Sequence, residues 1–127
     1  MVKYTEVDLY DEIHEIMVDA FNNDFHMVRI ESGFVHRGIP DINIGLFGKE
    51  IWIECKVGDF GLSPFQIGFM KQREAVGGKC YILRKWDKTY IVEKVDKDVS
   101  RHNNCFDAVN SILHDASGIT IRSKGNE

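Results

Sequence analysis

The sequence predicts an α/β domain in which a central mixed β-sheet of about four to five strands is flanked by helices, in the order αβββαββα. Three observations support this. Apolar residues recur every three or four positions between residues 5 and 21, which is the period of a helix. Residues 42–47 and 51–53 are short apolar runs around a glycine-containing break at residues 48–50, which is typical of a hairpin. The segment Ser63-Pro64-Phe65-Gln66 has the signature of a helix start.

Length and composition limit the number of domains and the class of protein that the chain can form. A chain of 127 residues suggests one domain, which we expect to span residues 1–127. No apolar run approaches the roughly 20 residues of a membrane span, and the N-terminus lacks a signal-peptide pattern. We therefore expect a cytoplasmic protein without membrane contact. Three cysteines without CxxC spacing (Cys55, Cys80 and Cys105) indicate reduced core thiols and not a zinc site or a disulfide framework.

The charge is distributed unevenly along the chain. Seven acidic residues and one lysine give residues 1–25 a net charge of −6, which leaves +2 for the rest of a chain whose total is −4. A total of −4 argues against a nucleic-acid partner, but the later part of the chain can approach a phosphate backbone while the first helix stays away from it.

The first helix is predicted over residues 5–21, with Thr5 as its N-cap. At about 100° per residue, Glu6 falls near the middle of the apolar stripe of this helix, and Glu12 falls at its edge. A carboxylate in such a stripe needs a partner or a metal. Either Glu6 reaches water from the first turn, or it is a third acid aimed at a metal site; Glu12 is the other candidate for that acid.

A strand is predicted over residues 26–31, followed by a loop that leads to Pro40-Asp41. Arg29 and Glu31 share one face of this strand, either as a surface ion pair or at the border of a site. The loop carries His36 and Arg37, and we expect it to lie at the edge of any site formed around Asp41. A loop histidine there either meets a phosphate or a base, or does nothing specific.

Later elements follow from capping and turn residues. We predict a helix from Ser63 to the Gly77-Gly78 pair, strands over 79–86 and 89–95 joined by Asp87-Lys88, a polar loop over 97–104, a helix over 105–115, and a further edge strand at 119–121. Lys71 and Arg73 lie on the polar side of the helix that begins at Ser63. Gln66 already has a local explanation, because Ser-x-x-Gln is a capping box.

The predicted hairpin brings three polar residues together. Glu54 and Lys56 point to the same side of their strand, and Cys55 points to the other. If the two strands are antiparallel neighbours, Asp41 at the start of the first lies beside the end of the second. Two converging carboxylates make a hard oxygen site for a divalent cation, and a lysine beside them can hold or polarise a water.

Pro40-Asp41, followed after twelve residues by Glu54-Cys55-Lys56, resembles the signature of the PD-(D/E)xK nuclease superfamily, and the order of elements resembles its restriction-endonuclease-like core. Within that superfamily the chain is most similar to small VRR-NUC and Holliday-junction-resolvase-like nucleases of phages and prokaryotes. The resemblance covers residues 5–83 and rests on Arg29, Gly33, Gly38 with Pro40-Asp41, Glu54-Cys55-Lys56, Leu62-Ser63-Pro64 with Gln66, and Gly77-Gly78.

The resemblance implies a Mg²⁺-dependent endonuclease, with Mn²⁺ as a substitute, in the cytoplasm of a prokaryote or of a phage-infected host. Asp41 and Glu54 would bind the metal with the Cys55 backbone carbonyl, and Glu6 would support it directly or through water. Lys56 would position or deprotonate the attacking water, and Gln66 would orient Lys56 or that water. The implied DNA contacts are Arg29, His36, Arg37, Lys71 and Arg73. Branched or structured DNA is an expected substrate, and cleaving a junction would call for a homodimer.

Two other interpretations stay open. One is a catalytically silent DNA-binding or structural module with the same fold, although such a module has no need of Asp41, Glu54 and Lys56 together. The other is an unrelated α/β protein whose hairpin only mimics the signature.

Overall fold

The computed structural model describes residues 3–31, 38–96 and 99–122. Its elements, in chain order, are α1 (Glu6–Phe21), β1 (His26–Arg29), β2 (Ile42–Leu46), β3 (Lys49–Val57), α2 (Pro64–Ala75), β4 (Lys79–Trp86), β5 (Thr89–Glu93), β6 (Val99–His102) and α3 (Cys105–Ser117). In this part of the chain the strands form one six-stranded sheet in sequence order. Neighbouring strands are antiparallel except β3 and β4, which are parallel because α2 crosses between them.

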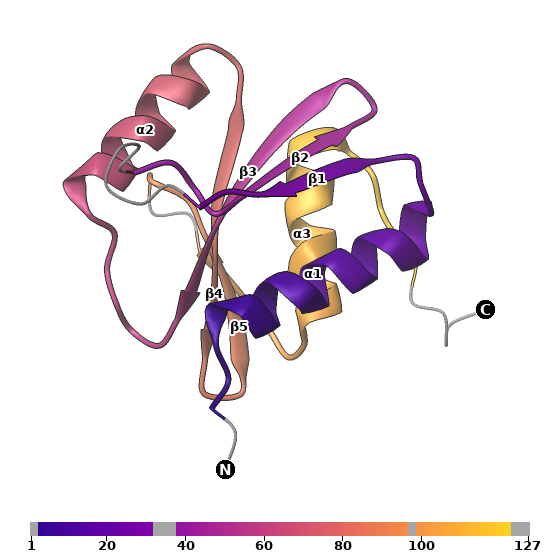
Figure 1. Cartoon of the computed structure of the whole chain (residues 1–127), viewed down its shortest axis with the longest axis horizontal. Helices are drawn as coiled ribbons and strands as arrows, with labels where there is room; N and C mark the ends of the chain where they lie inside the picture. The colour runs from indigo at the N-terminus through magenta and orange to yellow at the C-terminus, as the bar shows by residue number, and fades with distance from the viewer. Residues whose placement is uncertain (1–2, 32–37, 97–98, 123–127) are drawn as a thin grey trace.

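The sheet separates two helical layers. Figure 1 shows α2 on one side of the sheet and α1 and α3 on the other. A mixed sheet flanked by helices confirms the predicted α/β class, and the predicted order holds through β5.

Two predictions for the C-terminal part were wrong. The segment predicted as a polar loop contains strand β6, which pairs with β5 and alternates between exposed and half-buried residues. An edge strand without a fully buried face needs no apolar alternation, so its composition resembles that of a loop. Residues 119–121 form no strand. Ile121 instead packs into the core, and its amide donates to Asn110 Oδ1 at 2.9 Å.

The main core lies between the sheet and the α1–α3 layer. Leu9, Ile13 and Met17 on α1 are fully buried, which confirms the main part of the predicted apolar stripe. They pack with Ile53 and Cys55 of β3, among others. The opposite face of the sheet carries a smaller apolar cluster under α2, formed by Met70, Cys80 and Ile82 with Trp52 packed against it. Alternation along β3 therefore turns Trp52, Glu54 and Lys56 towards α2.

The hairpin between β2 and β3 turns at Phe47-Gly48, one residue earlier than the predicted break at 48–50. Both residues have positive φ, 48° for Phe47 and 78° for Gly48. This is the conformation of a two-residue type I′ turn, which matches the twist of the strands. Lys49 and Glu50 therefore already belong to β3.

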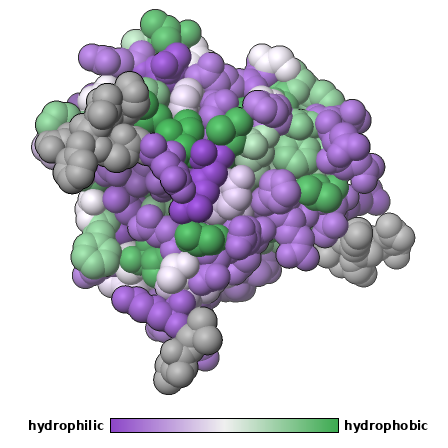
Figure 2. All heavy atoms as spheres, in the orientation of Figure 1, coloured by the Kyte–Doolittle hydropathy of each residue, from purple (hydrophilic) through white to green (hydrophobic). Residues whose placement is uncertain are grey.

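One face of the molecule is mainly polar. Figure 2 shows polar side chains over most of one face, with apolar side chains in small separate areas. Within the described residues, no helix combines the length and the apolar character needed to span a bilayer.

Gly38 ties the segment before Asp41 to the first turn of α2. Its φ is +88°, and a Cβ at this position would lie 2.4 Å from the carbonyl carbon and the carbonyl oxygen of Phe65. No side chain fits at that distance, because the obstructing atoms are backbone. The close approach fixes the position of Asp41, three residues later, relative to Gln66, which follows Phe65.

We predict that Gly38→Ala lowers the free energy of unfolding by roughly 2–4 kcal/mol, because it adds a backbone clash to the cost of a positive φ. Gly48→Ala is the matched control. Its φ is +78°, and a Cβ there would meet nothing within 4 Å, so only the positive φ should count, at about 1 kcal/mol. Urea denaturation measures both. Equal losses in the two variants would show that the contact with Phe65 does not matter.

Candidate active site

The candidate site lies where β3 extends beyond β2. Ile42, the first residue of β2, pairs with Ile53, whereas β3 continues to Val57 beside β4 alone. The amide of Cys55 therefore has no partner on β2, and Asp41 Oδ2 accepts its hydrogen bond at 2.8 Å. In this way Asp41 lies beside Glu54 and Lys56.

Glu54 is almost completely buried, with 4% of its surface exposed. Gln66 Nε2 donates to Glu54 Oε2 at 2.9 Å, and Lys56 Nζ lies 3.4 Å from the same oxygen. The other oxygen, Oε1, is buried and receives no hydrogen bond within the described part of the chain. A buried acceptor without a donor is costly, and a cation is the partner that a carboxylate oxygen in this position can bind.

Burial shifts the titration of both carboxyl groups. Burial first and then the charge of Asp41 raise the pKa of Glu54 to about 7, against the opposing effect of Lys56. Burial also raises the pKa of Asp41, against the Cys55 hydrogen bond and the charge of Lys56. Two neighbouring carboxyl groups with little access to water resist double ionisation. A bound cation would reverse that preference.

Glu6 lies at the start of α1 beside this pair. With Tyr10, Arg29, Asp41 and Cys55 it lines a cavity of about 30 Å³, enough for a water or an ion. Its side chain is exposed, as the first of the two alternatives for Glu6 predicts, because the first helical residue lies beyond the edge of the core. Partial burial and then the charge of Asp41 still raise the pKa of Glu6, against Lys56 and Arg29.

Glu12 lies elsewhere. Tyr4 Oη donates to Glu12 Oε1 at 2.9 Å, and Tyr90 Oη donates to Glu12 Oε2 at 2.9 Å. Glu12 thus joins α1 to β5, and its partners are tyrosines instead of the other carboxylates. Of the two acids considered on this helix, Glu6 is the one near Asp41.

Gln66 forms the predicted capping box, and its side chain also bonds Glu54, a partner that was not predicted. Its Oε1 accepts from the Ser63 amide at 2.8 Å, and its amide donates to Ser63 Oγ at 3.2 Å, which confirms the capping box. The remaining Nε2 group reaches Glu54. The helix start and the buried carboxylate are therefore held by one side chain.

The predicted DNA contacts are dispersed. Arg29 lines the cavity, lies 5.9 Å from the centre of the Tyr10 ring and is 3.8 Å from Glu31. Arg73 lies at the other end of α2, where it is 3.8 Å from Glu50, and it does not border Asp41 or Glu54. Lys71 is exposed on α2. His36 and Arg37 lie outside the described residues.

Cys55 is not available for chemistry, since burial raises the pKa of its thiol well above the usual value. The three cysteines are buried and free, as predicted.

Arg84 was missed at the sequence level. It is 7% exposed and pairs with Glu93 at 2.6 Å. Its Nη1 donates to the carbonyls of Gly58 at 2.8 Å and Phe60 at 2.6 Å, so it fixes the loop between Lys56 and α2. An arginine directly after the apolar run of residues 80–83, within the predicted strand, was the signal that could have identified it.

The donor set fits a divalent cation in part. Within residues 3–31, 38–96 and 99–122, no three His, Cys, Asp or Glu side chains are arranged to bind a metal ion. Asp41 and Glu54, with a backbone carbonyl, remain the predicted ligands. The unpartnered Oε1 of Glu54 is the feature that such an ion would satisfy.

Comparisons with known proteins leave the family open. No protein-family model matches the chain, and no curated protein matches it. Among solved structures, the chain is similar to the 1.6 Å structure of Hjc from Archaeoglobus fulgidus, a Holliday junction resolvase from an archaeal hyperthermophile. The TM-score is 0.48 and the identity 20%, over 68% of this chain and 75% of that one. A likeness at this level carries no argument about activity, which must come from the site.

We predict that the metal-free protein loses stability as pH rises from 5 to 8. The protonated form of Glu54 is favoured in the folded state, so its contribution is fully present below the ordinary pKa of 4.5 and is lost as pH rises through about 7. The loss should be roughly 3 kcal/mol. The measurement is the unfolding free energy of the wild type minus that of a D41N/E54Q variant at each pH.

Added Mg²⁺ or Mn²⁺ should stabilise the wild type more at pH 8 than at pH 5, because a metal binds deprotonated carboxylates. The D41N/E54Q variant should show neither the pH-dependent difference nor the gain from metal. A wild-type-minus-variant difference that stays constant from pH 5 to pH 8 would contradict the coupled titration.

Proposed function

We propose that this chain is a metal-dependent DNA endonuclease that hydrolyses phosphodiester bonds, with branched or otherwise structured DNA as its substrate. The observation that carries the proposal is the buried Oε1 of Glu54, which has no hydrogen-bond partner among the described residues and lies on the same side chain that Lys56 contacts, beside Asp41. The choice of DNA rests on the sequence resemblance described above.

The side chains have separate roles on this proposal. Asp41, Glu54 and the Cys55 carbonyl would hold Mg²⁺ or Mn²⁺, with Glu6 acting through water. When bound, the ion would lower the pKa of a water and offset charge that develops on the phosphate. Lys56, whose side chain is only 14% exposed, would position the attacking water and stabilise the same developing charge.

Supporting residues complete the arrangement. Gln66 would keep Glu54 in place through its hydrogen bond to Oε2. Arg29, at the cavity edge, would contact a phosphate next to the one attacked. A homodimer would supply the two sites that junction cleavage requires, whereas one protomer suffices for nicking.

The electrostatics of Glu54 argue against a catalytically silent module. A protein with no use for this carboxylate would be more stable with a neutral or apolar residue there, because an imperfectly paired buried charge costs more than a well-packed hydrophobic side chain. The raised pKa of Glu54 is the sign of that cost.

We expect Asp41→Ala and Glu54→Ala each to abolish Mg²⁺-dependent nicking of plasmid DNA, by at least ~100-fold, and to leave the fold intact. Circular dichroism checks the fold, and the wild type with EDTA is the inactive reference. Robust cleavage by either purified variant would refute the assignment of the two carboxylates.

Lys56→Ala should lose most turnover, roughly 100-fold, yet keep its affinity for Mn²⁺ in calorimetry. The reason is that the ammonium group acts on water and on transition-state charge, and not on the cation. If Lys56→Ala lost as much Mn²⁺ affinity as Asp41→Ala does, this division of roles would be wrong.

Glu6→Gln should cleave more slowly and gain less thermal stability from added Mn²⁺ than the wild type, while melting at or slightly above the wild-type temperature without metal. Loss of a charge beside Asp41 is the reason. Glu15→Gln is the control, because Glu15 is exposed on the same helix. Glu12 cannot serve as the control, since it is bonded to Tyr4 and Tyr90. Equal behaviour of the Glu6 and Glu15 variants would remove Glu6 from the site.

A further inference from the structure

A basic hollow lies at the end of α2, away from the candidate site. It has a volume of about 250 Å³ and is formed where the β2–β3 hairpin, the end of α2 and the start of β4 meet. Among the described residues that line this basic hollow, Lys49, Arg73 and Lys79 are cations and Glu50 is the one carboxylate. The basic hollow therefore carries a local charge of +2, although the chain as a whole carries −4.

Two aromatic rings and a glycine fix the position of Arg73. Its guanidinium carbon lies 5.4 Å from the centre of the Trp52 ring and 5.3 Å from the centre of the Phe69 ring. A Cβ at Gly78 would lie 2.4 Å from Arg73 Cγ and 2.9 Å from its Cδ, so the absence of a side chain there leaves room for the arginine. Ring contacts of this kind use the flat faces of a guanidinium and leave its N–H edges to donate.

The cations of the basic hollow are not neutralised inside the protein. Lys49 and Lys79 are exposed, and neither forms an ion pair within the described part of the chain. Arg73 Nη1 lies 3.8 Å from Glu50 Oε1, an oxygen that also accepts a hydrogen bond from Trp52 Nε1. Because 3.8 Å is too long for a hydrogen bond, this carboxylate does not satisfy the donors of Arg73. The three cations are therefore arranged to bind an anion from outside.

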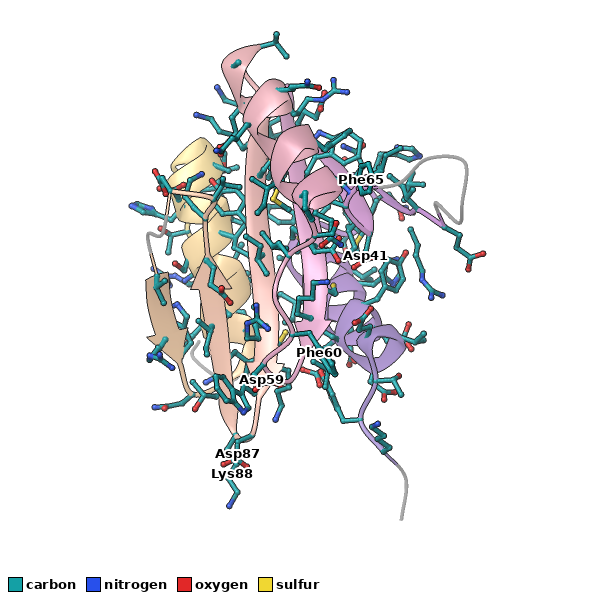
Figure 3. All side chains as sticks on the ribbon, turned by 90° about the vertical axis from the view of Figure 1, so that its left-hand side faces the viewer. Asp41, Asp59, Phe60, Phe65, Asp87 and Lys88 are labelled. Carbon is teal, nitrogen blue, oxygen red and sulfur yellow. The ribbon has the colours of Figure 1, made fainter. Side chains whose placement is uncertain are left out.

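The basic hollow and the candidate site lie along one side of α2. Gln66, which bonds Glu54, and Arg73 are seven residues apart, so they project from the same side of the helix, roughly 10 Å apart along its axis. Along β3, Glu50 precedes Glu54 by four residues, which is roughly 13 Å. Figure 3 shows Asp41 beside the start of α2 and the helix running away from it. The fold therefore holds the basic hollow at a fixed distance from the carboxylates.

We propose that the basic hollow binds a backbone phosphate of a duplex DNA arm, roughly three or four nucleotides from the phosphodiester bond that is cleaved. This rests on the proposed endonuclease function and names a part of the substrate that the protein needs beyond the cleaved bond. One strand of a DNA duplex carries a phosphate about every 3.4 Å of its axis, so roughly 10–13 Å corresponds to three or four nucleotides. An arginine fork and two lysines are side chains that bind phosphate oxygens.

The stiffness of a duplex suits two contact points at a fixed separation. A double helix has a persistence length of about 150 base pairs, so a few base pairs span this distance without bending. A single strand would lose conformational freedom when it binds both points. Because phosphate binding depends on the cations nearest to the DNA, a local cluster can supply it in a chain whose total charge is negative.

The experiment measures DNA binding without cleavage. A fluorescently labelled forked duplex is titrated with protein in EDTA between about 50 and 200 mM salt, and the slope of log K against log [salt] is recorded. Lys49→Gln, Arg73→Gln and Lys79→Gln each remove one cation, and Glu50→Gln removes the carboxylate. Lys88→Gln is the matched control, because Lys88 is an exposed lysine at the turn after β4, which lies far from α2 in Figure 3.

We expect each variant that removes a cation of the basic hollow to bind about three- to tenfold more weakly and to lower the salt slope by about 1. Glu50→Gln should bind more tightly than the wild type, an opposite effect that a merely structural role would not produce. Lys88→Gln should bind as the wild type does. Wild-type affinity and slope in a Lys49→Gln/Lys79→Gln variant would overturn the proposal, even if Arg73→Gln did not fold. An equal loss in Lys88→Gln would also overturn it.

Neutral phosphates locate the contact. Oligonucleotides carry one methylphosphonate at successive positions, counted from the bond that the wild type cleaves with Mg²⁺. Neutralising the phosphate roughly three or four nucleotides away should weaken wild-type binding and leave a Lys49→Gln/Arg73→Gln/Lys79→Gln variant unaffected. A sensitive position elsewhere would overturn the proposal, and so would an equal effect in a single strand of the same sequence.

A free anion is the other source of the same phosphate chemistry. Millimolar inorganic phosphate should raise the melting temperature of the wild type no more than that of the triple variant. If phosphate stabilised the wild type alone, and the two proteins bound DNA equally, the basic hollow would serve a free anion and the proposal would be overturned.

The two proposals fail separately. If the variants of the basic hollow lose affinity and salt slope but the wild type never cleaves DNA with Mg²⁺, the phosphate contact stands and the endonuclease is refuted. If the wild type cleaves with Mg²⁺ and the triple variant binds and cleaves equally well, the endonuclease stands and the phosphate contact is refuted. If the wild type binds no DNA, both are refuted.

Discussion

The hydrogen bond from the Cys55 amide to Asp41 is the interaction on which the rest of the site depends. β3 extends beyond the end of its pairing with β2, and without Asp41 the Cys55 amide would have no hydrogen-bond partner there. Because the partner is the Asp41 carboxylate and not another strand, Asp41 lies beside Glu54, where there is little water. Burial raises the pKa of both acids, and the charge of Asp41 adds to the shift at Glu54, whereas the Cys55 hydrogen bond itself lowers the pKa of Asp41. A sheet whose strands ended together would have no such site.

The second constraint is the start of α2, which reaches the site from the other side. Gln66 contacts Glu54 only because the helix begins at Pro64, and the contact of Gly38 with Phe65 holds that beginning against the segment that carries Asp41. Different elements therefore hold the two carboxylates. The Cys55 amide of β3 holds Asp41, and Gln66 at the start of α2 holds Glu54. Each can be disturbed separately, and the geometry between them depends on the Gly38 contact.

Local periodicity explains what the sequence could predict. Alternation along a strand places Glu54 and Lys56 together, and a capping signature marks the start of α2, so both could be derived from neighbours in the chain. What could not be derived depends on distant partners. Glu12 is defined by Tyr90, which follows it by 78 residues. Strand β6 is defined by pairing with β5, and its composition does not reveal that pairing.

The exposure of Glu6 shows the limit of helical periodicity. A helical wheel gives the direction of a side chain but not the place where the core ends, and α1 begins beyond that end. The same position that exposes Glu6 also lets it line the cavity with Asp41, so the acid needs no buried partner. A carboxylate that reaches both water and the cavity can exchange protons with solvent while it influences the buried pair. Asp41 and Glu54 are more deeply buried; the charge of Lys56 lowers the pKa of both, and a bound cation would lower it further.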